Sequence, residues 1–183
     1  MKMDNVIVVG AGLSGLALAL GLEKAGFTVD ILEQRCDFSN KGATFGLRHN
    51  GQKALDELCD EGIMESLHEI RIPIPGAGYM LAWYTVRDAI LQKAKERSRI
   101  KIHLQCNVHN IQDSDDCVRA HFVDASGASC ALPGCLLIGC DGVNSFVRTH
   151  VLELQPDKSS GTTTWRGSLK VPDDSPLVDL LEK

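Results

Sequence analysis

The chain begins with two short strand-like runs separated by a helical stripe of apolar residues. Asn5 to Val9 is a β-branched run that ends in glycine, a pattern typical of a parallel strand buried on both faces. Apolar residues then recur at helical spacing from Leu13 to Leu20, and Gly26 marks the end of this helix. Val29 to Glu33 indicates a second strand. Together these segments predict a right-handed βαβ unit.

The rest of the chain mixes helical and strand patterns. Gln34 to Asn50 is polar and contains glycines, which indicates a long functional loop, and Arg71 to Tyr79 contains two prolines, which indicates a connector. Further helices are predicted over Gly51 to Leu67, Val86 to Arg97 and Asn144 to Leu152. Further strands are predicted over Lys101 to Leu104, Val108 to Gln112, Val118 to Val123, Leu136 to Ile138 and Thr162 to Val171, with a hairpin turn at Asp124 to Gly127.

A glycine motif lies between the first predicted strand and helix. Gly10-Ala11-Gly12-Leu13-Ser14-Gly15 has the pattern G-x-G-x-x-G. The first glycine permits a tight turn, the second lets the backbone approach a pyrophosphate, and the third allows close helix-strand packing. Glu33 follows about 20 residues later, where a carboxylate accepts hydrogen bonds from an adenosine ribose. Because a carboxylate favours a free 2′-hydroxyl, the motif predicts FAD or NAD, and the alternative is a glycine-rich turn with a surface glutamate.

Four segments in order along the chain resemble the FAD-dependent aromatic hydroxylases, the family that includes 4-hydroxybenzoate and salicylate hydroxylases. They are the glycine motif with Glu33-Gln34-Arg35, the loop Lys41 to Asn50, Arg87 in an R-x-x-I pattern, and Leu137 to Arg148 around Asp141-Gly142. The loop has His49 where the family usually has proline. The resemblance implies an NAD(P)H-dependent flavin monooxygenase that binds FAD and hydroxylates a small aromatic or related substrate.

The resemblance also implies a set of site residues and leaves the catalytic residue unassigned. The cofactor-binding residues it implies are Gly10, Gly12, Leu13, Ser14, Gly15, Glu33, Arg35, Arg87 and Asp141. Asp141 directly follows an apolar strand, where open α/β sheets bind ligands, although a turn that caps the next helix is the alternative. Arg87 suits a pyrophosphate or a flavin-side hydroxyl, with a solvated helix charge as the alternative. Arg35 either packs over the adenine or is a surface residue.

The length of 183 residues is about half of what the family usually has. The expected fold class is therefore α/β, a Rossmann-like FAD/NAD(P)-binding domain with an added β-rich segment and the start of a substrate-domain sheet. We assign residues 1–155 to the FAD-binding domain, with the stretch near 68–85 open to interruption, and residues 156–183 to a truncated start of the substrate domain. Weak FAD affinity and uncoupled peroxide release are expected, because half of the pocket is missing.

Two interpretations remain. The first is a flavin monooxygenase, truncated or completed by a second chain, and the second is a non-catalytic dinucleotide-binding remnant or interaction module. An NAD-dependent Rossmann dehydrogenase is disfavoured, because it would not share the loop at Gly42 or the motif at Asp141.

Charge, hydropathy and cysteine content limit the binding partners, location and metal sites that the sequence predicts. Lys and Arg number 19 against 24 Asp and Glu, so the net charge of −5 predicts no nucleic-acid partner. The apolar stretch from Val6 to Leu22 is short for a membrane span, and its glycines fit a turn better than a signal peptide. Seven cysteines without a C-x-x-C pair indicate reduced thiols and a cytoplasmic protein. No metal site is expected, because strand alternation separates Cys130, Cys135 and Cys140.

Overall fold

A four-stranded parallel sheet forms the centre of the molecule. The computed structural model describes residues 4–38, 43–59, 62–67, 71–153 and 161–163. The order of strands in this sheet is β10-β1-β2-β6, and their bounds are Asn5–Val9 for β1, Thr28–Leu32 for β2, Ile100–His103 for β6 and Leu136–Gly139 for β10. The side chains of Val6, Ile7 and Val8 are fully buried. The β-branched run at the start of the chain is thus the predicted central strand, covered on both faces.

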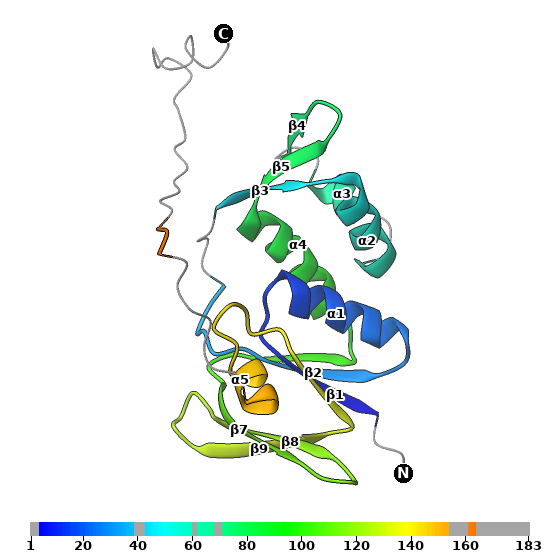
Figure 1. Cartoon of the computed structure of the whole chain (residues 1–183). Helices are drawn as coiled ribbons and strands as arrows, with labels where there is room; N and C mark the ends of the chain where they lie inside the picture. Colours follow the sequence, from blue (N-terminus) through cyan, green and yellow to red (C-terminus); the bar gives the residue numbers. More distant parts are fainter. Residues whose placement is uncertain (1–3, 39–42, 60–61, 68–70, 154–160, 164–183) are drawn as a thin grey trace.

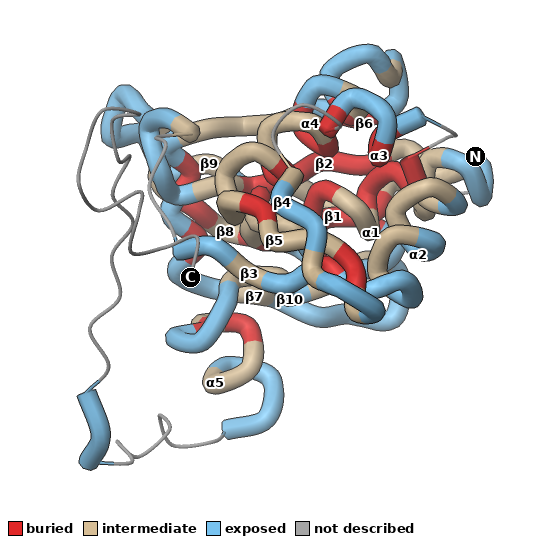
Figure 2. Tube along the Cα trace, turned by 90° about the horizontal axis from the view of Figure 1, so that it is seen from above, coloured by how far each residue is buried: buried red, intermediate tan, exposed pale blue. Residues whose placement is uncertain are grey.

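Helices cover one face of this sheet (Figure 1). The first layer contains α1 (Leu13–Lys24) and α4 (Trp83–Lys95), and α2 (His49–Cys59) and α3 (Ile63–Ser66) pack further out. The apolar stripe of α1 buries Leu16 and Leu20 against Val6 and Val8 of β1. Figure 2 shows the buried positions concentrated in these central elements. The helix predicted over Gly51 to Leu67 is divided, because Gly62 adopts a left-handed φ of 105° between α2 and α3.

An antiparallel sheet covers the opposite face. It consists of β7 (Asn107–Asp113), β8 (Val118–Val123) and β9 (Ser129–Gly134) in that order, and α5 (Phe146–Leu152) packs against β7 and β10. Ile7 and Val9 of β1 join Phe122 and Val147 in its apolar core. The hairpin predicted after Val123 therefore pairs β8 with β9, whereas β10 runs parallel to β1.

A second antiparallel sheet lies beyond the helices, where the sequence predicted a loop and a connector, so these two predictions were wrong in part. Its order is β3-β5-β4, with bounds Thr44–Leu47 for β3, Ile72–Ile74 for β4 and Gly78–Ala82 for β5. β3 lies inside the predicted loop, and β4 and the first two residues of β5 lie inside the predicted connector. Pro73 is accommodated because β4 is an edge strand that pairs only with β5.

The architecture confirms the α/β class with a Rossmann-like domain and a β-rich segment. The strand predicted over Thr162 to Val171 lies almost entirely outside the described residues, as do nearly all of residues 156–183 and the loop positions Lys41 and Gly42. The apolar stretch from Val6 to Leu22 forms most of β1 and α1. Of the helices in the described ranges, none is long and apolar enough to cross a membrane.

Candidate cofactor site

Two glycines of the motif are required by close backbone contacts at the end of β1. Gly10 has a φ of +102°, and a Cβ there would lie 2.5 Å from the carbonyl oxygen of Cys140. A Cβ on Gly15 would overlap the carbonyl oxygen of Gly10. The first and third glycines therefore make the tight turn and the close helix-strand packing that the motif predicts.

Gly12 has different surroundings. A Cβ at this position would meet no atom within 4 Å. Gly12 is also the N-cap residue of α1, in extended backbone geometry and without a side chain that could cap the helix. The N-terminal end of α1 thus has open space beside Gly12, and a helix N-terminus is where a phosphate is stabilised. This cradle fits the pyrophosphate of a dinucleotide.

Glu33 links the glycine motif to the loop that follows β2. Its Oε2 accepts a hydrogen bond from the backbone N–H of Ala11 at 2.8 Å, and its Oε1 accepts one from the N–H of Arg35 at 2.9 Å. A carboxylate has about four acceptor positions, so each oxygen can accept a further hydrogen bond. The half-buried carboxylate is therefore fixed in place and still able to hold a ribose hydroxyl.

A cavity of about 600 Å³ brings most of the predicted residues together. Its lining includes Gly10, Gly12, Glu33, Arg35, Arg87 and Asp141. Leu13, Ser14 and Gly15 are not among the lining residues. Leu13 packs against the apolar core, and Ser14 is exposed on α1. The prediction missed Phe38 and Trp83, which also line the cavity. The signal in the sequence that could have found Trp83 is its position, as an aromatic residue three positions before the helix predicted from Val86.

Arg87 is buried at the wall of this cavity. Its side chain is 2% exposed, and Nη2 donates hydrogen bonds to the carbonyl oxygen of Phe38 at 2.9 Å and to Asp88 Oδ1 at 2.6 Å. The guanidinium lies over the rings of Phe38 and Trp83, 5.5 and 5.3 Å from their centroids. The alternative of a solvated helix charge is therefore wrong. The Arg87 guanidinium on α4 is therefore fixed against the loop that follows β2.

Asp141 caps α5 from the end of β10. Its Oδ1 accepts a hydrogen bond from the Ser145 hydroxyl at 2.5 Å, and its Oδ2 accepts one from the backbone N–H of Val147 at 3.0 Å. Ser145 in turn accepts from the N–H of Arg148 at 3.0 Å. The capping alternative thus describes part of what this carboxylate does, and the same carboxylate lies on the cavity wall with acceptor positions to spare.

Cys140 is a neutral group beside the glycine motif. Its N–H donates to the carbonyl oxygen of Val9 at 2.7 Å, and its Cβ lies next to Gly15. Burial, and then the nearby Asp141 carboxylate, raise the pKa of its thiol, so the thiol stays protonated at neutral pH. Across the described part of the chain, no cluster of three or more His, Cys, Asp or Glu side chains could hold a metal ion.

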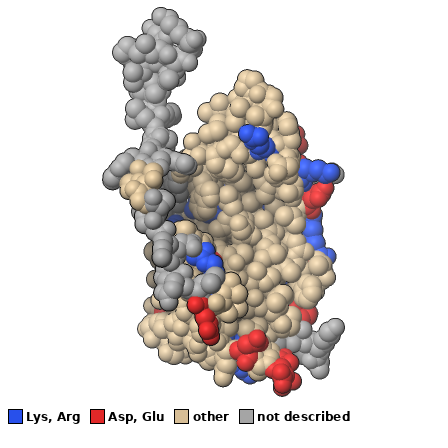
Figure 3. All heavy atoms as spheres, in the orientation of Figure 1, with Lys and Arg blue, Asp and Glu red and all other residues tan. Residues whose placement is uncertain are grey.

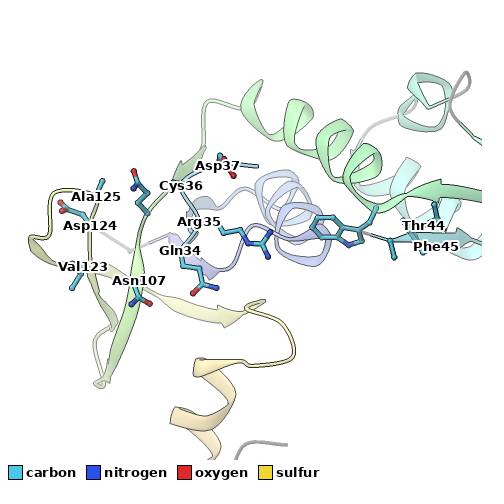
Figure 4. Close-up of a pocket in the computed structure, with 13 residues that line it drawn as sticks. Gln34, Arg35, Cys36, Asp37, Thr44, Phe45, Asn107, Val123, Asp124 and Ala125 are labelled. Atoms are coloured by element: carbon cyan, nitrogen blue, oxygen red, sulfur yellow. The ribbon is translucent and has the colours of Figure 1, made fainter. Parts of the chain in front are cut away.

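A second, larger cavity of about 1240 Å³ adjoins the first. Figure 4 shows Val123, Asp124 and Ala125 on one side of this cavity and Thr44 and Phe45 on the other. The loop after β2 lies between them, and the Arg35 side chain extends toward the β3 side (Figure 4). On the face drawn in Figure 3, acidic side chains gather over the end that holds β7, β8 and β9. The two cavities share five lining residues, namely Gln34, Arg35, Asp37, Trp83 and Asn107.

A parallel sheet with a glycine turn, a helix N-terminus and a carboxylate after the second strand defines a dinucleotide-binding fold of the Rossmann type. The sequence model of the FAD binding domain family matches residues 3–182, and the chain belongs to this family. FAD, the predicted cofactor, is confirmed at the level of the family.

The curated relatives are named as monooxygenases. The chain is 31% identical to 6-hydroxynicotinate 3-monooxygenase of Bordetella bronchiseptica, over 93% of this chain and 49% of that protein. It is 29% identical to the FAD-dependent monooxygenase olcE of Penicillium canescens, over 93% of this chain and 41% of that protein. The chain thus spans about half the length of the curated relatives it matches. The resemblance to FAD-dependent monooxygenases drawn from the four motifs is confirmed.

Solved structures share the fold. The p-nitrophenol 4-monooxygenase PnpA of Pseudomonas putida DLL-E4 superposes with a TM-score of 0.68 and 23% identity, over 82% of this chain and 44% of that one. CtdE in complex with FAD superposes with a TM-score of 0.70 and 22% identity, over 81% of this chain and 40% of that one.

Proposed function

We propose that this chain is the FAD-binding part of an NAD(P)H-dependent monooxygenase that hydroxylates a small aromatic or related substrate. The observation that carries the proposal is the open space at Gly12, bordered by the α1 N-terminus and the fixed Glu33 carboxylate in one cavity. The names of the relatives support the reaction class, and 6-hydroxynicotinate, a small aromatic acid in one of those names, supports the substrate class. FAD supplies the oxygen-transfer chemistry once it is bound and reduced.

Each residue has a proposed role toward FAD. Glu33 accepts hydrogen bonds from the adenosine ribose, while Gly12 and the first turn of α1 hold the pyrophosphate. Arg87 presents a desolvated guanidinium, which strengthens its attraction for a phosphate or hydroxyl oxygen. Asp141 accepts from a ligand hydroxyl while it caps α5. Arg35 packs over the adenine. Residues 1–155 form the domain that carries these groups.

Retention of FAD tests the binding part of the proposal. The protein is purified, incubated with FAD and freed of excess ligand, after which its visible absorbance is recorded. Glu33→Ala is expected to weaken FAD about 10-fold or more, because a carboxylate hydrogen bond is lost. Glu57→Ala is the matched control, since Glu57 is an exposed α2 residue outside both cavities. A colourless wild-type protein, or equal FAD affinity of Glu33→Ala and wild type, would contradict the proposal.

Oxygen consumption tests the reaction. The FAD-loaded protein is expected to oxidise NADH or NADPH and to do so faster with a suitable small aromatic compound. Hydrogen peroxide is measured alongside, because it reports reduced flavin that reacts with oxygen without hydroxylation. Retained FAD with no oxidation of either nucleotide would favour the alternative of a non-catalytic dinucleotide-binding module.

A further inference from the structure

We propose that Trp83 is a stacking residue for the isoalloxazine ring of FAD, placed at the passage between the two cavities. This inference rests on the proposed FAD site and adds a residue that the glycine motif, Glu33 and Asp141 do not cover. Trp83 opens α4, and its backbone N–H donates to the carbonyl oxygen of Ala43 at 3.1 Å. The backbone of Trp83 is thereby tied to the residue that precedes β3.

The Trp83 indole has a cation over its ring and belongs to a residue that lines both cavities. The Arg87 guanidinium lies over one face, 5.3 Å from the ring centroid. Arg87 lines only the smaller of the two cavities, whereas Trp83 lines both. Trp83 thus lies where the two cavities meet, with the Arg87 cation over one face of its ring. Phe45 lines the larger cavity from β3, so this end of the space has an aromatic wall.

The position of the ADP part of FAD decides which other part of FAD lies against Trp83 and Phe45. Glu33 holds the adenosine ribose and Gly12 the pyrophosphate, so ADP fills the smaller cavity. The ribityl chain and the ring then need further room, and the cavity that adjoins at Trp83 offers about 1240 Å³. A planar ring against an indole gains an offset-stacked contact in addition to the apolar area it buries. Trp83 thus contributes to FAD binding mainly through the ring, while Glu33 and Gly12 hold the ADP part.

Fluorescence separates this role from simple packing against Arg87. The sequence contains two tryptophans, so Trp165→Phe leaves Trp83 as the single indole reporter. In that variant FAD is expected to quench indole emission strongly, and ADP is expected to change it little. Trp83→Leu is expected to raise the emission of the bound flavin and to weaken FAD about 3- to 10-fold, with ADP affinity within about twofold of wild type. Trp83→Phe retains an aromatic ring, so its FAD affinity and flavin emission should lie between those of wild type and Trp83→Leu.

The control is Tyr84→Leu, the neighbouring aromatic of α4, which lines neither cavity. It should leave both affinities and the flavin emission unchanged. If Trp83→Leu weakens ADP and FAD equally, Trp83 acts only by holding Arg87, and the proposal is overturned. If wild-type protein binds FAD while Trp83→Leu leaves flavin emission and affinity unchanged, only the stacking role fails. If wild type does not bind FAD, the proposed function and this role both fail.

Discussion

Gly12 and Gly15 lie three positions apart, yet a methyl group at each would have opposite consequences. At Gly15 a Cβ meets the backbone of Gly10, which cannot move without displacing the turn at the end of β1. At Gly12 a Cβ projects into space where the ligand is proposed to lie, and its φ of −74° suits any residue. Folding and ligand binding therefore depend on different glycines of one motif.

Gly15→Ala is expected to lower the free energy of unfolding by about 3 kcal/mol, because the overlap is with backbone rather than with a flexible side chain. Gly12→Ala should leave stability within about 0.5 kcal/mol of wild type and abolish FAD retention. Urea denaturation and FAD titration of both variants check this pair. If Gly12→Ala binds FAD normally, the pyrophosphate does not lie at Gly12.

The cysteines should differ widely in reactivity. Burial raises the pKa of the Cys59 thiol to about 11, so at pH 8 only about 0.1% of it is thiolate. Cys36 and Cys135 are exposed. Iodoacetamide at pH 8 is expected to modify Cys36 and Cys135 first and Cys59 last, and a rise in pH should increase the thiolate fraction of Cys59 about 10-fold per unit until its pKa. Peptide mass spectrometry gives the order, and fast modification of Cys59 would show that its packing on α2 opens readily.

Among the secondary structure elements, the β8–β9 hairpin depends on one carboxylate. Asp124 Oδ1 accepts hydrogen bonds from the Ser126 hydroxyl at 2.6 Å and from the N–H groups of Ser126 and Ala128 at 2.8 and 3.1 Å. The Ser126 hydroxyl, and then these N–H groups, hold the pKa of the Asp124 carboxyl below its usual value. The charged form is therefore the one that stabilises the turn.

Asp124→Ala is expected to lower the melting temperature at pH 7. The lowered pKa means that the ionised carboxylate stabilises the fold above the unfolded-state pKa, and this contribution is lost as the pH falls through the folded-state pKa. The difference between variant and wild type should thus shrink as the pH falls below about 4. Asp115→Ala, in the preceding β7–β8 turn, is the control. A difference that stays constant with pH would assign the effect to the turn backbone rather than to the charge.

The elements differ in how far local sequence determines them. The β1-α1-β2 unit was predictable, because a β-branched run, a helical repeat of apolar residues and a stop glycine are all local signals. The sheet of β3, β4 and β5 was not, because β3 pairs with a strand more than 30 positions away. Pro73 in β4 also reads locally as a break.

The candidate site shows the same division between local and distant signals. The glycine motif and Glu33 were found from spacing. Arg87 was found by resemblance, whereas its contact with the Phe38 carbonyl joins residues 49 positions apart and required the fold. Asp141 was assigned both a ligand-facing and a capping alternative, and only the structure shows that one carboxylate can serve both.

At the scale of the whole molecule, β1 contributes alternate residues to two apolar layers. Val6 and Val8 face the helices, while Ile7 and Val9 face the β7-β8-β9 sheet and α5. Because alternate residues of one strand belong to opposite layers, loss of packing on one face displaces the strand that supports the other. The two layers should therefore unfold in one transition.

Ile7→Ala tests this coupling from the side opposite to Trp83. Removing the fully buried Ile7 side chain should cost about 2–5 kcal/mol, and Ile7→Val about 0.5–1.5 kcal/mol, through lost apolar burial and the cavity left behind. In the Trp165→Phe background, Trp83 emission reports the helical side, and far-ultraviolet circular dichroism reports the whole chain. Both signals are expected to shift to the same lower urea midpoint in Ile7→Ala, because the sheet transmits the loss across its two faces. A circular dichroism midpoint that falls while the Trp83 midpoint stays in place would instead mean that the β7-β8-β9 layer unfolds by itself, while the helical side that carries Trp83 stays folded.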